Sequence, residues 1–157
     1  MAESIQEVYS LMIPTISSHI LLPNANIAEV VPFNNVELFK EDSEKPNWYL
    51  GHLLWRGMNV PLVSIDLIKG EVEAKANKRA RVAIAQTLNS NSDIPYLAIV
   101  VQGIPRLSHV RIDNIQYMQD ENLSPAEKMR VEIDSKSASI PDLDQLESMV
   151  IEANAAA

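Results

Sequence analysis

The chain has 157 residues, a formal net charge of −8 at pH 7 and no cysteine. This length is typical of one domain with its own hydrophobic core. The lack of cysteine excludes disulfides, thiol nucleophiles and Cys-ligated zinc, and it fits a reducing compartment. The negative charge argues against a nucleic-acid partner, because a phosphate backbone is bound by clustered Lys and Arg. We therefore expect a cytoplasmic protein.

The amino terminus does not resemble a targeting signal. Glu3 and Glu7 stand where a secretory signal carries positive charge. No apolar run approaches the roughly 20 residues that a membrane helix needs. We therefore expect no membrane span.

Short apolar runs bounded by Pro, Gly, Asn or Ser dominate the chain, and this rhythm predicts mostly β structure. The first half predicts a three-stranded meander, then a loop or short helix over the polar stretch 34–47. A hairpin around Gly57 and a helical turn at 66–68 follow. The strands predicted here are 8–13, 19–22, 27–31, 48–56 and 60–65.

The polar segment 69–78 is the best candidate for a crossover between two halves of a single domain spanning 1–157. These halves, 8–70 and 79–151, are alike only in strand rhythm. The second half predicts strands at 79–87, 96–102, 107–112 and 129–134.

Two segments have the spacing of a helix capping box or its Asp variant, Ser124-Pro-Ala-Glu127 and Ser139-Ile-Pro-Asp142. Only the second precedes helical periodicity. Its apolar face consists of Leu143, Leu146, Met149 and Val150.

The sequence contains no recognisable catalytic motif. His19, His52 and His109 lie in neither HxH nor HExxH spacing, so each is expected to be a surface or hydrogen-bonded strand histidine. No GxSxG elbow occurs, and the four glycines form no phosphate-binding loop.

Three acids near the carboxyl terminus, Asp142, Asp144 and Glu147, resemble a metal-binding cluster. The dipole of a helix that begins there is the simpler explanation for them. We therefore expect no catalytic residue, no metal and no cofactor, and hence a protein that is not an enzyme.

The segment Gly51-His-Leu-Leu-Trp55-Arg56-Gly57, followed by Asn59-Val-Pro61-Leu-Val-Ser-Ile65-Asp66-Leu67, resembles the CheW-like domain family. The family comprises coupling proteins of bacterial chemosensory arrays and the regulatory domain of their histidine kinases. Its pattern is a strand with Gly, then Arg-Gly, a short turn, and a strand reading Pro-Val-Ile-Asp-Leu. Upstream, Leu21-Leu-Pro23 and Ile27-Ala-Glu29-Val30-Val31 also resemble the family.

The resemblance weakens in the second half, where Gln102 replaces an aspartate that usually follows the family's apolar strand. Among coupling proteins, the chain looks most like the divergent ChpC-like type that serves twitching-motility systems.

The resemblance implies an all-β fold of two intertwined SH3-like β-barrel subdomains, with a short C-terminal helix. It also implies a non-catalytic adaptor that binds a chemoreceptor (a methyl-accepting chemotaxis protein) and a CheA-type histidine kinase. The partner-binding residues that it indicates are Gly51, Arg56, Gly57 and Asn59.

Each glycine also has a structural interpretation, Gly57 in a turn and Gly51 in a bulge or a close backbone approach. Arg56 could pair with a receptor carboxylate or with an internal acid such as Glu29. Strand alternation places Trp55 opposite Arg56 and predicts that Trp55 is a core anchor.

Asp66 is expected to cap the helical turn that follows it. Two rival functions stay open, an SH3-like scaffold outside a receptor array and a small β-barrel enzyme with an unrecognised site. An enzyme would show a deep pocket with perturbed titrating groups, and an adaptor would show flat apolar patches and exposed sheet edges.

Overall fold

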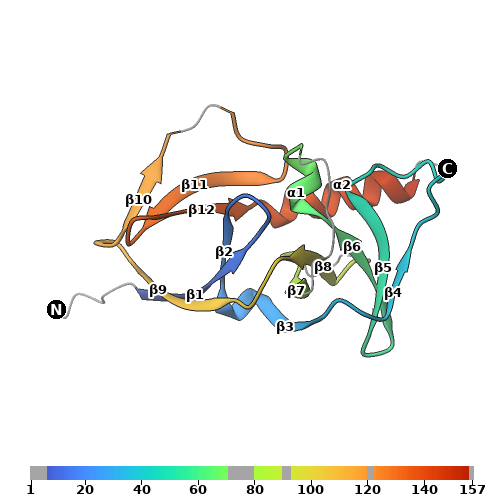
Figure 1. The fold of residues 1–157 in the computed structure, drawn as a ribbon, viewed down its shortest axis with the longest axis horizontal. Helices are drawn as coiled ribbons and strands as arrows, with labels where there is room; N and C mark the ends of the chain where they lie inside the picture. Colours follow the sequence, from blue (N-terminus) through green and yellow to red (C-terminus); the bar gives the residue numbers. More distant parts are fainter. Residues whose placement is uncertain (1–6, 71–79, 90–92, 120–121, 156–157) are drawn as a thin grey trace.

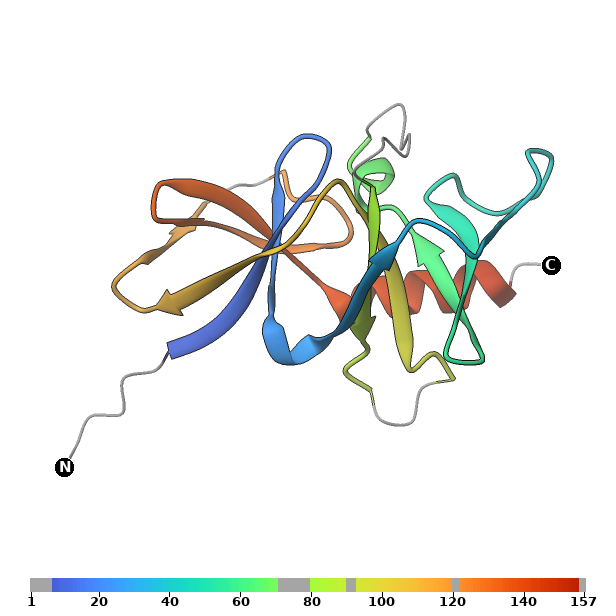
Figure 2. The same cartoon turned by 60° about the horizontal axis from the view of Figure 1, so that its bottom comes forward.

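Twelve strands build two six-stranded sheets in the computed structural model, which describes residues 7–70, 80–89, 93–119 and 122–155. The sheets lie side by side along the molecule (Figure 1, Figure 2). The predicted fold class, all-β with a short C-terminal helix, is confirmed.

The first sheet has the strand order β10-β11-β12-β2-β1-β9. Two strands come from the start of the chain and four from its end. Their bounds are β1 Glu7–Pro14, β2 His19–Pro23, β9 Arg106–Arg111, β10 Ile115–Met118, β11 Glu127–Ile133 and β12 Lys136–Pro141.

The second sheet has the order β3-β7-β8-β6-β5-β4. Its bounds are β3 Ile27–Pro32, β4 Val36–Leu38, β5 Tyr49–Trp55, β6 Met58–Val63, β7 Arg81–Gln86 and β8 Tyr96–Val101. Both sheets therefore take strands from both sequence halves, 8–70 and 79–151, and this interlocking is the predicted intertwined arrangement. Most of the predicted crossover, 69–78, lies outside the described residues.

The predicted meander is wrong at its third strand. After the 3-10 turn η1 (Asn24–Asn26), β3 leaves the first sheet and pairs with β7 in the second. Three strands were also missed, β4 within the predicted loop 34–47, β10 and β12. These are short or serine-containing, so they lack the apolar runs on which the prediction depended.

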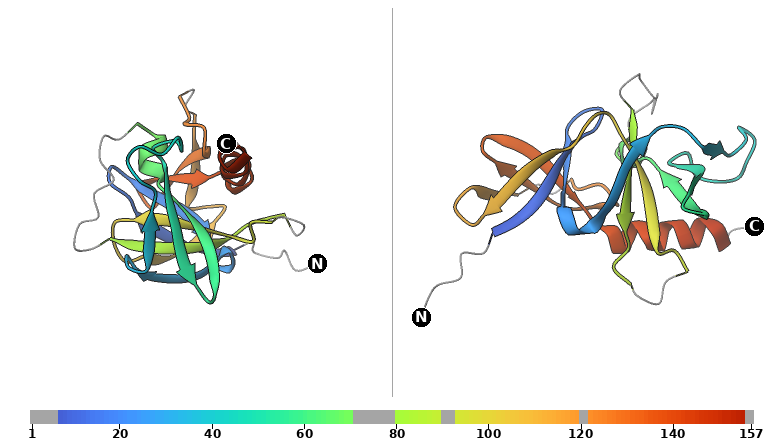
Figure 3. Two further views of the ribbon diagram at one scale, coloured as in Figure 1. Left: turned by 90° about the vertical axis from the view of Figure 1, so that its right-hand side faces the viewer. Right: turned by 90° about the horizontal axis from the view of Figure 1, so that it is seen from below.

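Helix α2 (Leu143–Ala155) lies alongside the second sheet (Figure 3). Leu143, Leu146 and Val150 are buried in the largest hydrophobic cluster, as the periodicity predicted, whereas Met149 of the same predicted face is half-buried and lies outside that cluster. Its cap is Asp142, which accepts a hydrogen bond from the Gln145 amide at 3.0 Å. The capping-box prediction placed the hydroxyl of Ser139 at this start, but Ser139 belongs to β12.

The other capping-box candidate does not begin a helix. The Ser124 amide donates to Glu127 Oε1 at 2.9 Å, and the Glu127 amide donates to the Ser124 carbonyl at 3.0 Å. These bonds close a turn from which the chain continues as β11, so one of the two hydrogen bonds of a capping box, from the Ser124 amide to the Glu127 carboxylate, forms without a helix.

The short helix α1 (Ile65–Ile68) confirms the predicted helical turn. Its cap is Ser64, whose Oγ accepts from the Leu67 amide at 3.2 Å. The prediction that Asp66 is the cap is therefore wrong. Asp66 is only 2% exposed, and both its carboxylate oxygens accept from the Ile16 amide at 3.2 Å. Asp66 thus ties α1 to the loop after β1.

Candidate functional site

The β5–β6 hairpin carries the four predicted partner-binding residues, and Arg56 and Gly57 form its two-residue turn. Both have positive φ, 47° for Arg56 and 76° for Gly57. Two central residues with positive φ characterise the type I′ turn, whose twist matches that of the flanking strands. A Cβ on Gly57 would meet no atom within 4 Å, so backbone conformation alone favours glycine here. The predicted turn role of Gly57 is confirmed.

Arg56 lies beside Trp55, which corrects the prediction that the two face opposite sides of a strand. Strand β5 ends at Trp55, and the left-handed conformation of Arg56 breaks the alternation. As a result, the guanidinium carbon of Arg56 lies 4.5 Å from the centroid of the Trp55 ring. This distance is within the range of a cation–π interaction.

Glu29 on β3 joins these two side chains into a group that we call the hairpin cluster, Glu29, Trp55 and Arg56. Glu29 Oε1 accepts from the Trp55 indole N–H at 3.0 Å and from the Arg56 guanidinium at 3.3 Å. Trp55 is buried and packs edge-on against Tyr96, so its predicted anchoring role is confirmed. The side chains of Arg56 and Glu29 are 64% and 44% exposed. The pair is therefore accessible from solvent.

Gly51 lies at the opposite end of β5 from the turn. Its φ is 151°, and the strand register shifts between Tyr49 and Gly51. A Cβ on Gly51 would lie 2.0 Å from the carbonyl oxygen of Glu37 in β4. Both structural interpretations of Gly51, a bulge and a close backbone approach, are confirmed.

Asn59 on β6 is exposed and pairs with Leu54, whose exposed fraction is 58%. Beside Asn59 opens a cleft of about 580 Å³ between the hairpin and the end of α2. Its lining includes Met58, Pro61 and Ile151. The hairpin therefore presents one cation, one amide and nearby apolar surface to solvent.

Two titrating groups near this cleft have shifted pKa values. Burial raises the pKa of Tyr49 and lowers the pKa of His52. The Tyr49 hydroxyl donates to Asn154 Oδ1 at 3.0 Å and lies 3.3 Å from His52 Nε2. Lys45 Nζ donates to the Ala153 carbonyl nearby at 2.8 Å. These groups hold the end of α2 against the second sheet, which is a structural role.

The other candidates for chemistry also have structural partners. His109 Nδ1 lies 2.9 Å from Glu7 Oε1, as expected for a hydrogen-bonded strand histidine. Asp144 and Glu147 both accept from Asn89 Nδ2, at 3.2 and 3.3 Å. Within the described ranges, no three His, Asp or Glu side chains are grouped to hold a metal ion.

A second acid-centred group, which we call the junction cluster, was not predicted from the sequence. It consists of Lys69, Glu127 and Arg130. Arg130 Nε lies 2.7 Å and Lys69 Nζ 3.9 Å from Glu127 Oε2. Burial raises the pKa of Glu127, but hydrogen bonds from Arg130 and the Ser124 amide and the charge of Lys69 outweigh burial and lower it to about 2. In the sequence, only the i, i+3 spacing of Glu127 and Arg130 indicates the junction cluster.

Comparison with known families decides the classification. The family model of the CheW-like domain matches residues 11–149. The chain belongs to the CheW-like domain family. The resemblance carried by the Arg56-Gly57 segment is thereby confirmed.

A solved structure with the same fold is that of the scaffolding protein TtCheW from Thermoanaerobacter tengcongensis. It has 16% sequence identity and a TM-score of 0.69, and the alignment covers 87% of this chain and 89% of that one. This likeness supports the assignment of the two curled sheets as SH3-like barrels. The search of curated protein sequences found no significant match. None of the described helices has the length and apolar character needed to cross a membrane.

Proposed function

We propose that this CheW-like protein is a non-catalytic cytoplasmic adaptor that couples chemoreceptors to a CheA-type histidine kinase. The family match over residues 11–149 carries the proposal. Such an adaptor needs one surface for the receptor and another for the kinase, and the two interlocked barrels offer room for both. Receptor state then reaches the kinase as a change in the population of its active form.

We place the receptor contact at the tip of the β5–β6 hairpin, with Arg56 and Asn59 as contacting side chains. Gly51 and Gly57 contribute by shaping the hairpin. An exposed ion pair contributes about 0–1 kcal/mol, so Arg56 can exchange Glu29 for a carboxylate on a receptor helix at little cost. The planar guanidinium favours bidentate binding of such a carboxylate.

The kinase contact and the type of motility that the protein serves are further parts of this proposal. Gln102, in place of the expected aspartate, agrees with a divergent coupling protein of the ChpC-like, twitching-motility type. Deletion of the gene should then abolish twitching and leave swimming intact. The opposite phenotype would assign the protein to a flagellar system.

A bridging experiment tests the coupling role. The kinase's CheW-like regulatory domain is immobilised, and the cytoplasmic fragment of a receptor from the same cell is added with or without the purified adaptor. We expect retention of the receptor fragment to require the adaptor. Binding of the adaptor to neither protein would contradict the proposal, and binding to one alone would reduce it to a scaffold outside a receptor array.

A further inference from the structure

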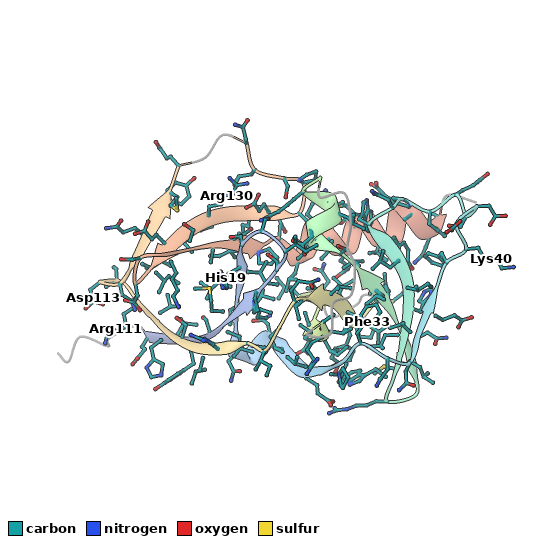
Figure 4. The ribbon with its side chains drawn as sticks, viewed as in Figure 1. His19, Phe33, Lys40, Arg111, Asp113 and Arg130 are labelled. Carbon is teal, nitrogen blue, oxygen red and sulfur yellow. The ribbon has the colours of Figure 1, made fainter. Side chains whose placement is uncertain are left out.

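A second cleft, of about 760 Å³, shares no lining residue with the cleft beside Asn59. Its walls come from both sheets. Strands β1, β2, β9 and β12 contribute from the first sheet, and β7 and the segment after β8 contribute from the second. Figure 4 shows one lining residue, His19, towards the middle of the molecule. The cleft therefore lies where the two sheets meet.

The charge of this cleft is opposite to that of the whole chain. The ionisable residues that line it are Arg81, Arg106, Lys136 and His19, and no acid among the described residues lines it, although the net charge of the chain is −8. In the part of the chain that the structure describes, none of these four forms an ion pair. Arg81 donates one hydrogen bond, to the Ala80 carbonyl at 3.0 Å. The cleft thus has uncompensated positive charge and unused N–H donors.

Gln102 adds a neutral donor to the same wall. Its side-chain Nε2 is buried and has no hydrogen-bond partner among the described residues. Its backbone is fixed, because the Gln102 amide donates to the Pro14 carbonyl at 2.8 Å. Buried amide donors are nearly always paired, so this group suggests a missing acceptor. Because glutamine is neutral, Gln102 puts no negative charge into the cleft.

We propose that this cleft binds a small phosphorylated compound with at least two negative charges, of the diphosphate or nucleotide class. Phosphate oxygens are acceptors that the two guanidinium groups, Lys136 and the Gln102 amide would satisfy. The volume is within the range of small-molecule sites. Met12, Pro14 and Ile104 provide an apolar wall for a base or another uncharged part of the ligand. Such a ligand would contact both sheets at once.

Isothermal titration calorimetry of the full chain with pyrophosphate and with ADP, both free of metal ions, tests this site. Citrate serves as a carboxylate of similar charge. We expect saturable binding of at least one phosphate compound, weakened by added salt because the attraction is between charges. Citrate should bind at least tenfold more weakly.

Two variants connect binding to the cleft. Arg106→Gln removes an exposed cation of the cleft, and Gln102→Glu puts a carboxylate of nearly the same shape beside the ligand. Each should weaken phosphate binding at least tenfold, since each removes or opposes a charge-assisted contact. Arg111→Gln is the matched control, because Arg111 lies on the same strand as Arg106 but does not line the cleft. It should bind as the unmodified chain does.

Circular dichroism melting shows whether each variant is folded. If Gln102→Glu fails to fold, Arg106→Gln carries the test, since its side chain is on the surface. Absence of binding by both phosphate compounds would overturn the proposal. So would binding that both variants leave unchanged, and equal binding of citrate would overturn the assignment to phosphate.

Discussion

The hairpin cluster and the junction cluster use the same chemistry in opposite surroundings. In each, a glutamate accepts hydrogen bonds from an arginine, Arg56 to Glu29 in one and Arg130 to Glu127 in the other. The exposed fraction of the glutamate side chain is 44% in the hairpin cluster and 0% in the junction cluster. The shorter distance belongs to the buried pair, 2.7 Å against 3.3 Å. The two clusters therefore differ in the burial of their glutamate.

This difference assigns different roles to two similar pairs. Water screens the charges of the hairpin cluster, so the pair adds little stability and its arginine is available to a partner. Glu127 has lost its water, so its charge depends on Arg130, Lys69 and the Ser124 amide. The junction cluster belongs to the stability of the fold, and the hairpin cluster to recognition.

The same substitution in both clusters should give the largest contrast. Glu127→Gln removes the buried charge and leaves Arg130 and Lys69 without their carboxylate, which should cost about 2 to 4 kcal/mol. Glu29→Gln is the matched change in the hairpin cluster and should cost under about 1 kcal/mol. Urea denaturation at pH 7 measures both. Equal losses would mean that burial does not distinguish the two clusters.

Acidic pH should reduce the loss of stability that Glu127→Gln causes. The pKa of Glu127 is about 2 in the folded chain, below the usual glutamate value of 4.5. The stability that its charge provides is therefore complete above pH 4.5 and is lost as the pH falls towards 2. We expect the gap between the unmodified chain and Glu127→Gln to narrow by about 2 kcal/mol between pH 7 and pH 3. Denaturation series at the two pH values would show this, and a constant gap would contradict the lowered pKa.

The two clusters also differ in how well the sequence predicted them. Trp55 and Arg56 were identified because the hairpin is local and because Arg56-Gly57 belongs to a family motif, and Glu29 was named as one of two alternative partners of Arg56. The junction cluster was missed because its burial results from the strand order, with Lys69 far from β11 along the chain. Asp66 was misassigned for a similar reason, since its partner, the Ile16 amide, is 50 positions away.

Strand positions were predicted well wherever apolar runs mark them, but their partners were predicted only for the hairpin neighbours β1–β2 and β5–β6. Nothing in the run 27–31 indicates that it leaves the first sheet to pair with β7. The orientation of Arg56 was also beyond the alternation rule, because that rule holds only within a strand and Arg56 has a positive φ. Both the pairing of β3 with β7 and the orientation of Arg56 depend on the tertiary arrangement.

Trp55→Phe should have a smaller effect than the loss of Glu127. It removes the hydrogen bond from the indole N–H to Glu29 and some buried ring volume, and should cost about 1 to 2 kcal/mol. The stacking partner of Arg56 becomes smaller as well. Thermal melting measures the stability, and receptor binding should weaken only modestly. If Trp55→Phe lost as much stability as Glu127→Gln, Trp55 rather than the Glu29–Arg56 ion pair would be the main source of stability in the hairpin cluster.

A small effect on stability should also come from Arg56→Glu. The change removes an exposed pair and a cation–π contact and places two carboxylates side by side, each screened by water. We expect a cost of about 1 kcal/mol in thermal melting. Receptor binding, measured by pull-down with a receptor fragment, should be lost, because an attractive contact becomes a like-charge contact. Arg56→Lys keeps the charge without the planar fork and should bind with intermediate strength.

Arg111→Glu is the control for this last experiment. Arg111 lies 3.2 Å from Asp113 at the end of the first sheet (Figure 4), and its side chain is 48% exposed. Arg111→Glu therefore reverses a charge and breaks an exposed ion pair, as Arg56→Glu does, but it leaves the hairpin unchanged. Receptor binding should persist.

Loss of about 3 to 5 kcal/mol in Arg56→Glu would be the size expected for breaking a buried pair and would contradict the conclusion that Arg56 is accessible. A normal melt with normal binding would leave the Arg-Gly motif a turn without a role in recognition.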